Sequence, residues 1–465
     1  MKGPAATPAP PVSWCLIFLS VDGRSRRPEY RAPDGEMAMA HVQPAVPGSP
    51  DTSFGDNGER SLPQIADTDR FITDVAIHDD TITVCGLTGD HEQSRYTLLR
   101  FDDKGDLDPT FGNKGIVFGT FDPVAESGAE AIVVDANAKI WMLGWVNSAG
   151  KPHRLVMARF DAQGALDTSY ASPHGYLALD QDNSLHLKLH STSLQLRAGH
   201  LLASATLESD WLATHACVYR LDLAGNAGFP SGQFIEITHP SGTVQIANVI
   251  AQESTFLVAG TLRNGPETRG FIARFRNDGT PDPSFGDRYG FKLYESPLSR
   301  WLRWLPRWLR WLAPRRNANI RFNTLIQRPD GHLIVAGNLP GERPEDTNAM
   351  TWQFDAEGVR DATYNHGNPT VLTFNTHTED EWEAAALHQD GKLVVFGLGG
   401  QRIYRARYTV HGRLDTAFGN QGIAFQDYPK DRKMIAVAMT PAATLLGLNS
   451  QHAWGFSGLL ARFRN

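Results

Sequence analysis

One short motif recurs along the chain at near-regular intervals, and this repetition limits the possible folds more than any other feature of the sequence. Its clearest copy spans residues 100–115 and reads Arg-Phe-Asp-x-x-Gly-x-Leu-Asp-x-Thr-Phe-Gly-x-x-Gly. A fixed internal period is typical of repeat architectures, in which each repeat is one supersecondary unit. Counted from the second conserved aspartate, or from Gly228 where it is replaced, the units start at residues 51, 108, 167, 228, 282, 361 and 415.

Two apolar runs typical of β-strands lie between successive motifs. The first ends in Gly or another small residue, and several copies follow an Asp-Gly pair, as at Asp330-Gly331. Such a pair between apolar runs predicts a β-hairpin. With a strand before the hairpin and a strand after the Phe-Gly turn, each unit is predicted to contain four short strands. The small-residue-ended runs are 81–86, 139–144, 200–204, 255–260, 332–337, 392–397 and 443–447, and the closing runs are 96–101, 155–160, 216–221, 271–275, 350–354, 403–408 and 459–463.

Seven units of four strands predict an all-β fold, a seven-bladed β-propeller of four-stranded blades. A single sheet leaves both faces exposed, whereas a ring of sheets buries each face against a neighbour. The predicted propeller spans residues 51–465, with an insertion at 296–318 that lengthens the fifth unit. Because the last unit ends on its closing strand and the first starts at its turn, we expect the terminal units to meet side by side.

Residues 1–50 differ in composition from the repeats. They are rich in Pro and Ala, and their apolar stretch, Trp14–Leu19, has only six residues. A secretory signal needs about 7–15 apolar residues followed by a small-residue cleavage site. We therefore expect a flexible N-terminal extension at 1–50 without a clear signal peptide, which makes the cytoplasm the default location. Met37 offers an alternative start, which would place residues 1–36 outside the native protein.

The repeated motif resembles the delta-60 repeat, a bacterial β-propeller repeat. The resemblance rests on the pattern at residues 100–115 and extends over residues 51–465. It implies a propeller fold. It implies no particular activity, because propellers host many unrelated functions.

The conserved residues of the motif are predicted to have structural roles. Gly105 and its equivalents occupy a turn position that needs positive φ. Asp108 and its equivalents are predicted to accept hydrogen bonds from backbone N–H groups two or three residues later. The aromatic residue that follows is predicted to pack between blades. These aromatic residues are Phe111, Tyr170, Phe285, Tyr364 and Phe418.

Composition excludes several classes of protein. The net charge is −7, with 44 Lys and Arg against 51 Asp and Glu, so no overall positive field favours nucleic acid. No apolar run reaches the length of a transmembrane helix. The three cysteines are too few for a disulfide framework. Cys85 and Cys217 lie in strand-like runs and are predicted to be buried free thiols.

No motif for catalysis, cofactor binding or metal binding stands out. The acidic run at 102–108 lacks the Gly and Glu positions of a calcium loop, and a plain turn is predicted there. His186 and His190 alternate with leucines, which indicates a strand on which the two imidazoles lie too far apart to share a metal ion. We therefore expect no cofactor and no catalytic residue. A site assembled in the central tunnel from several blades would be scattered in sequence and invisible to motifs.

The insertion is the most unusual segment. It contains six Arg, no acidic residue and four of the eleven Trp of the protein. At helical spacing, its arginines form one stripe with Trp and Leu on most of the remainder, which is typical of a basic amphipathic helix at a membrane surface. The alternative is a tandem duplication that folds back on the propeller rim. The candidate contact residues are Arg300, Trp301, Arg303, Trp304, Arg307, Trp308, Arg310 and Trp311.

An acidic run occupies the equivalent loop of the next unit. Equivalent loops of adjacent blades leave the same rim of a propeller, so we expect the two oppositely charged loops to be neighbours and to dock reversibly. A solvated acidic loop without a partner is the alternative. The candidate docking residues are Glu379, Asp380, Glu381 and Glu383.

The sequence as a whole predicts a non-enzymatic binding or interaction propeller of unknown ligand. Its partner would be a protein, a glycan or an anionic membrane surface that contacts the Arg/Trp insertion. The alternative is an enzyme or a sugar-binding propeller with a site in the central tunnel or on one rim. Three or more acidic or His side chains converging in the tunnel would favour that alternative, whereas an apolar tunnel would favour the binding scaffold.

Overall fold

The structure is a computed structural model of the whole chain. The structure describes residues 46–63, 69–89, 94–148, 154–179, 188–208, 214–295, 319–341, 346–374, 380–399, 402–428, 432–452 and 455–465. The predicted N-terminal extension lies almost entirely outside these ranges, as does the whole insertion at 296–318.

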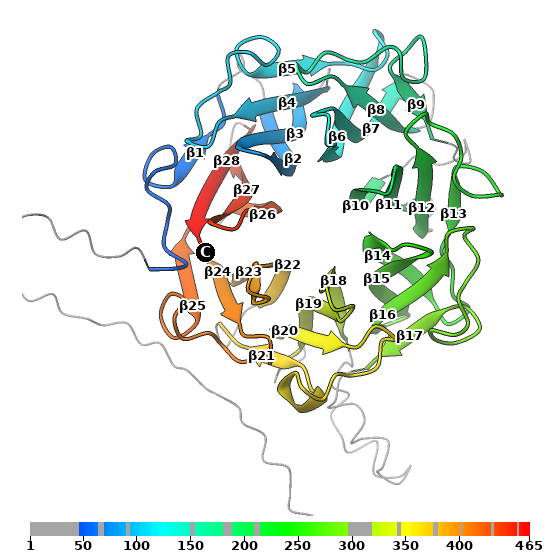
Figure 1. Cartoon of the computed structure of the whole chain (residues 1–465), viewed down its shortest axis with the longest axis vertical. Coiled ribbons are helices and arrows are strands. Elements are labelled where there is room, and N and C mark those ends of the chain that lie inside the picture. Colours follow the sequence, from blue (N-terminus) through cyan, green and yellow to red (C-terminus); the bar gives the residue numbers. More distant parts are fainter. Residues whose placement is uncertain are drawn as a thin grey trace, which may run out of the picture. The chain divides into compact units, whose positions relative to one another are not determined.

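Within residues 45–465, seven antiparallel four-stranded sheets form a ring, which confirms the predicted seven-bladed β-propeller (Figure 1). The innermost strand of every blade contacts the innermost strand of the next, and β26 contacts β2, so the ring is closed. The first three blades are β2 (Asp69–His78), β3 (Thr81–Gly89), β4 (Arg95–Phe101) and β5 (Ile116–Gly119); β6 (Ala125–Val134), β7 (Ile140–Ser148), β8 (Arg154–Phe160) and β9 (Tyr176–Ala178); and β10 (Lys188–Arg197), β11 (His200–Glu208), β12 (Thr214–Asp222) and β13 (Phe234–Glu236). The next three are β14 (Thr243–Ala251), β15 (Thr255–Asn264), β16 (Glu267–Arg276) and β17 (Phe291–Tyr294); β18 (Arg321–Gln327), β19 (Leu333–Pro340), β20 (Thr347–Phe354) and β21 (Thr370–Leu372); and β22 (Glu381–Leu387), β23 (Leu393–Gly399), β24 (Arg402–Tyr408) and β25 (Ile423–Asp427).

The seventh blade is completed by the N-terminal strand. It contains β26 (Arg432–Met439), β27 (Ala443–His452), β28 (Gly455–Arg464) and β1 (Glu59–Ser61). Strand β1 pairs antiparallel with β28, with Arg60 opposite Leu460. Each blade therefore takes its outermost strand from the following sequence unit, and blades start one strand later than sequence units. The terminal units do not merely meet side by side, because they share a sheet.

Every inner strand carries a β-bulge that faces the second strand of its blade. In blade 6 the register shifts between Trp382 and Ala384, and Gly397 lies opposite Trp382. A Cβ atom on Gly397 would lie 1.8 Å from the carbonyl oxygen of Glu381, so only glycine fits there. The sequence predicts that the glycines of the small-residue-ended runs end their strands. In the structure these glycines lie inside the strands instead. In five blades a carbonyl group of the bulged strand lies close to this glycine, which is Gly86, Gly144, Gly260, Gly337 or Gly397.

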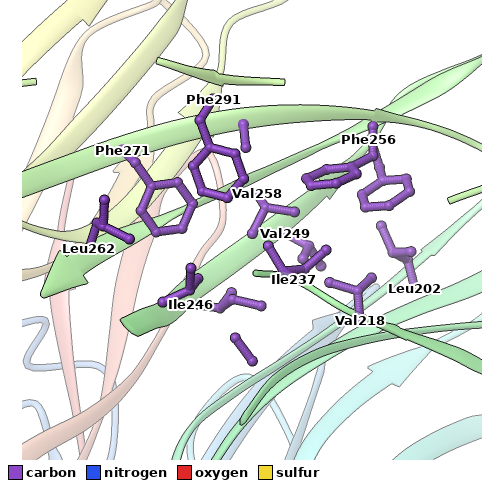
Figure 2. Packing of buried hydrophobic residues seen from close by; sticks show 14 of the residues in the cluster. Leu202, Val218, Ile237, Ile246, Val249, Phe256, Val258, Leu262, Phe271 and Phe291 are labelled. Atoms are coloured by element: carbon purple, nitrogen blue, oxygen red, sulfur yellow. The ribbon is translucent and has the colours of Figure 1, made fainter. Parts of the chain in front are cut away.

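The core lies between neighbouring blades. Figure 2 shows the cluster between blades 3 and 4, where Leu202 and Val218 of one blade meet Ile246, Val249 and Val258 of the next. The aromatic residues of the repeated motif are buried, and the ring of Phe54 packs close to Gly105 of the neighbouring turn. This confirms that these side chains pack between blades. Burial of apolar surface at about 25 cal/mol per Å² in each of seven such interfaces is the main source of stability.

A repeated ion pair ties the third strand of most blades to the turn that follows. Arg100 Nε donates to Asp108 Oδ2 at 2.8 Å, and Asp108 Oδ1 accepts the N–H of Thr110, which confirms the predicted Asx turn. Arg100 also donates to the carbonyl of Ala162 in the next blade. The guanidinium thus joins two blades while it covers the Phe111 ring. The other pairs of this kind are Arg462 with Asp51, Arg159 with Asp167, Arg274 with Asp282 and Arg407 with Asp415.

Candidate functional site

The Arg/Trp insertion, with all eight of its candidate contact residues, lies outside the described residues. Its two ends are placed, because β17 ends at Tyr294 and β18 begins at Arg321. The N–H of Thr268 donates to Asn319 Oδ1 at 3.0 Å, and the N–H of Ile320 donates to the Thr268 carbonyl at 3.3 Å. The second end of the insertion is therefore fixed to the beginning of β16 in blade 4.

The acidic run is only partly described, and its described members make specific contacts. Glu379 lies outside the described residues. Asp380 is fully buried, and its Oδ2 accepts the N–H of Phe374 at 2.6 Å. Glu381 Oε2 accepts hydrogen bonds from the side-chain amides of Asn323 and Asn338 in blade 5. Glu383 occupies the bulge of β22. Asp380 and Glu381 thus hold the first residues of blade 6 against blade 5.

Both loops emerge from the same edge of the ring. The insertion connects the outer strand of blade 4 to the inner strand of blade 5, and the acidic run makes the same connection from blade 5 to blade 6. The N–H of Asp380 donates to the Thr347 carbonyl, which places this connection beside the loop between β19 and β20. Equivalent connections in adjacent blades bring the two loop bases to neighbouring positions on one rim.

The inner strands that surround the central channel are joined by side chains rather than by backbone pairing. Asn248 Nδ2 donates to the Leu325 carbonyl at 2.9 Å, while Asn248 Oδ1 accepts the Leu325 N–H at the same distance. Asn449, on β27 of blade 7, makes the same pair of bonds to Ile72 of the inner strand β2. Asp74 Oδ2 accepts the N–H of Ile132 in the next blade. These polar side chains satisfy backbone groups that the separated inner strands would otherwise leave unpaired.

Two buried acids lie between blades 1 and 2. Burial raises the pKa of Asp74 to about 6, although hydrogen bonds from the N–H groups of Ile132 and Val75 act to lower it. Burial also raises the pKa of Glu130 to about 7, although Trp145 Nε1 donates to its Oε1 at 3.0 Å. The pKa of the nearby Cys85 thiol is raised by burial and by the charge of Asp74. Cys85 and Cys217 are both buried and free, as predicted.

The two segments considered as candidate metal sites in the sequence form an ordinary turn and part of a strand. Asp102 Oδ1 accepts the N–H groups of Lys104 and Asp106, which confirms a plain turn. His190 lies in strand β10, as its alternation with leucines predicts. Across the described part of the chain, no group of three or more His, Cys, Asp or Glu side chains is arranged to hold a metal ion. In the same part, no helix is long and apolar enough to cross a membrane.

A cavity of about 530 Å³ opens between blades 3, 4 and 5, at the ends of their inner strands. Three polar or charged side chains from strands contribute to its wall: Gln195, Arg197 and Gln327. Arg328 follows β18 and lies in the wall as well. The other wall residues are Ile250, Leu325, Ile326, Pro329 and Gly331.

Arg328 is held rigidly in this wall. Only 6% of the residue is exposed, its Nε donates to Gln353 Oε1 at 2.8 Å, and its Nη1 donates to the Gly391 carbonyl of blade 6. Its Nη2 is buried and has no hydrogen-bond partner among the described residues. Burial lowers the pKa of this guanidinium, although the carboxylates of Asp330 and Asp361 act in the opposite direction.

Apart from Gly331 of the Asp-Gly turn, none of the cavity residues was singled out from the sequence. Gln195 and Arg197 lie in β10, and Gln327 and Arg328 lie at the end of β18 and directly after it, more than a hundred residues later. The ring brings these strands to one end of the channel.

The comparisons with known proteins support a β-propeller and leave the function open. Residues 257–285 match a family described as a β-propeller domain of unknown function, DUF5122. These residues lie in blade 4 and in the turn that follows its third strand. A search of the curated proteins found no match.

Solved structures of several kinds share limited similarity with the chain. The first is the crystal structure of the polysaccharide lyase Uly1, with 9% identity and a TM-score of 0.44 over 85% of this chain and 90% of that one. Sqt1 from Chaetomium thermophilum has 11% identity and a TM-score of 0.42 over 85% and 95%. Drosophila semaphorin 1a, domains 1–2, has 8% identity and a TM-score of 0.48 over 85% and 86%. Likeness at this level does not assign an activity.

Proposed function

We propose that the protein is a non-enzymatic binding propeller, built from delta-60-type repeats, that attaches to an anionic membrane surface or an acidic protein partner through the rim that carries residues 296–318. The observation that carries this proposal is the position of the insertion. Its bases lie on the rim of the ring, between blades 4 and 5, where a segment can contact a surface without disturbing any blade interface.

The charge distribution supports attachment at this position. The insertion contributes six Arg to a chain of net charge −7, and without them the net charge would be −13. A positive segment on an acidic body directs the insertion toward an anionic surface while the body is repelled from it. The four Trp supply the amphipathic rings that favour a membrane interface.

The acidic loop supports a reversible form of this attachment. Its base lies next to that of the insertion, so the remaining carboxylate of the loop can pair with insertion arginines when no partner is bound. Asp380 and Glu381 already contact other residues of the propeller, and Glu383 lies in strand β22, so Glu379 is the candidate docking residue in the loop itself. Exposed ion pairs are worth about 0–1 kcal/mol each, so salt or an anionic surface would displace them.

The alternative is an enzyme or a sugar-binding propeller with a site in the channel or on a rim. The polar side chains between neighbouring blades support the scaffold instead, since Asn248, Asn449 and Asp74 are occupied by backbone groups of the adjacent blade. The cavity between blades 3, 4 and 5 is the feature that favours a small-molecule site.

Vesicle binding tests the proposal. The intact chain is titrated with vesicles of anionic and of neutral lipid at low and high salt, and Trp fluorescence and co-sedimentation are measured. We expect a blue shift with anionic vesicles that high salt reverses, and no shift for a chain that lacks residues 300–316. A matched variant keeps the segment and replaces Arg300, Arg303, Arg307 and Arg310 with Gln, which should retain the Trp but lose the binding. Equal binding by the intact chain and the deletion, or none by either, would contradict the proposal.

A further inference from the structure

The cavity between blades 3, 4 and 5 presents hydrogen-bond donors that have no partner within the described protein. Gln327 makes no hydrogen bond to any described residue, and Gln195 uses only its Oε1, which accepts the N–H of Ala251 at 3.1 Å. Arg197 makes one described hydrogen bond, from Nη1 to the Ala251 carbonyl at 2.6 Å, and is exposed. The amide and guanidinium N–H groups that remain are suited to an acceptor-rich ligand.

The residues of the cavity wall also carry an excess of positive charge. It contains two guanidinium groups and no carboxylate. Neither Arg197 nor Arg328 makes an ion pair with a described residue. The two carboxylates that act on Arg328 at a distance are engaged elsewhere, as Asp330 contacts His332 and Asp361 contacts Gln353 and Thr363. Since Arg328 is buried and fixed by two hydrogen bonds, its positive charge acts on the cavity without reorganisation.

The three walls are held in place before any ligand binds. Strands β10 and β14 are joined by successive side chains on one face of β10, because Ser193, Gln195 and Arg197 each bond the backbone of β14. Strands β14 and β18 are joined by the paired bonds between Asn248 and Leu325. A preformed site avoids the entropic cost of ordering its walls on binding.

We propose that this cavity binds a small organic carboxylate. Arg197 binds the carboxylate directly, the side-chain amides of Gln195 and Gln327 donate to its oxygen atoms, and Arg328 supplies a fixed positive charge. Ile250 and Leu325 contact the carbon skeleton. The volume of about 530 Å³ lies within the range of small-molecule sites. Guanidinium groups are suited to planar carboxylates, with which they form two parallel hydrogen bonds.

This site is independent of the rim attachment proposed above. It lies at the ends of the inner strands that lead into the hairpin turns, whereas the insertion leaves the ring at the opposite ends of the strands. A variant of one therefore leaves the other intact, and failure of either proposal does not affect the other.

The test is calorimetric titration of the full chain at low salt with three probes: succinate, its uncharged analogue succinamide, and inorganic phosphate. Arg197→Gln removes the exposed guanidinium, and Gln327→Leu removes an amide that bonds no described residue, so neither should affect folding. Arg263→Gln is the matched control, because Arg263 is exposed at the far end of β15 and lies outside the cavity.

We expect the intact protein to bind succinate and to bind succinamide at least tenfold more weakly. Arg197→Gln should weaken succinate binding at least tenfold, Gln327→Leu by a smaller factor, and Arg263→Gln by less than twofold. The proposal is overturned if succinate does not bind at about 10 mM, if Arg197→Gln binds as tightly as the intact protein, or if phosphate binds more tightly than succinate.

Discussion

The guanidinium of Arg405 lies 3.6 Å from the centre of the Phe463 ring, across the interface between blades 6 and 7. Arg405 is 2% exposed, and its Nε and Nη1 have no hydrogen-bond partner among the described residues. Burial lowers its pKa to about 10. It lies two residues before the motif arginine of its strand, where blade 1 has Leu98 and blade 7 has Leu460. A charged group therefore occupies a core position.

Replacing Arg405 with Met should leave the protein as stable as before, or more stable by about 1–3 kcal/mol. The substitution removes the desolvation cost of a buried charge, which outweighs a cation–π contact worth up to about 2 kcal/mol. The measurement is urea unfolding at pH 7. Leu98→Met at the equivalent position is the control and should cost less than about 1.5 kcal/mol. A loss above 2 kcal/mol for Arg405→Met would mean that the guanidinium has a partner the structure does not describe.

Glu130→Gln should stabilise the protein at pH 8 and have little effect at pH 4. Because burial raises the pKa of Glu130 from 4.5 to about 7, the folded state holds the proton more tightly than the unfolded state. The contribution of Glu130 is fully present below about pH 4.5 and is lost as the pH rises to about 7. At 1.36 kcal/mol per pKa unit, the loss is roughly 3 kcal/mol.

Glutamine keeps the acceptor for Trp145 without the charge, so the variant should show a flatter dependence of unfolding free energy on pH. Urea unfolding at pH 4, 6 and 8 measures this dependence. Glu253→Gln removes a charge from an exposed turn and should change stability by less than about 0.5 kcal/mol. Parallel pH profiles for the parent and Glu130→Gln would show that Glu130 ionises in the folded state without cost.

Gly397→Ala should destabilise the protein by about 3 kcal/mol or more, because the new Cβ would lie 1.8 Å from the Glu381 carbonyl oxygen. Gly447 of blade 7 lies one residue away from the corresponding position, opposite Ala436 on the other side of the bulge, and the nearest atoms to its Cβ would be side-chain methyl groups at 2.9 and 3.2 Å. Gly447→Ala should therefore cost only about 1 kcal/mol. Thermal unfolding of both variants measures the difference, and equal losses would show that the bulge in blade 6 relaxes.

Removing residues 1–61 should prevent folding or cause aggregation, whereas removing residues 1–45 should not. The longer deletion removes β1 and exposes the edge of β28. It also removes Asp51, the ion-pair partner of Arg462, and Pro47, whose carbonyl accepts the Gly419 N–H of blade 6. Solubility, size-exclusion chromatography and circular dichroism distinguish the outcomes. A soluble chain that begins at residue 62 and unfolds cooperatively would show that the ring does not depend on β1.

The same reasoning holds for the last strand. Deletion of residues 456–465 removes most of β28 and leaves β1 without a partner, so this chain should also fail to fold cooperatively. Solubility and circular dichroism measure this, and a soluble chain without residues 456–465 that unfolds cooperatively would show that the ring does not depend on β28.

The number and spacing of the repeats in the sequence by themselves determined the fold class and the number of blades. Seven units of four strands bury all of their sheet faces when they close into a ring. The role of Asp108 followed from local turn chemistry, and that of Phe111 from its apolar side chain. The two cysteines were correctly predicted to be buried for the same reason, since both lie in short apolar strands.

Only the tertiary structure determined the features that depend on contacts between different strands and blades. The sequence could not show that β1 completes blade 7, because repeat boundaries do not mark where a ring is opened. It could not show why Gly397 is glycine, since the clash involves a carbonyl on another strand. The cavity with Arg197 and Arg328 was hidden for the same physical reason. Its walls come from separate blades, and only closure of the ring brings their side chains together.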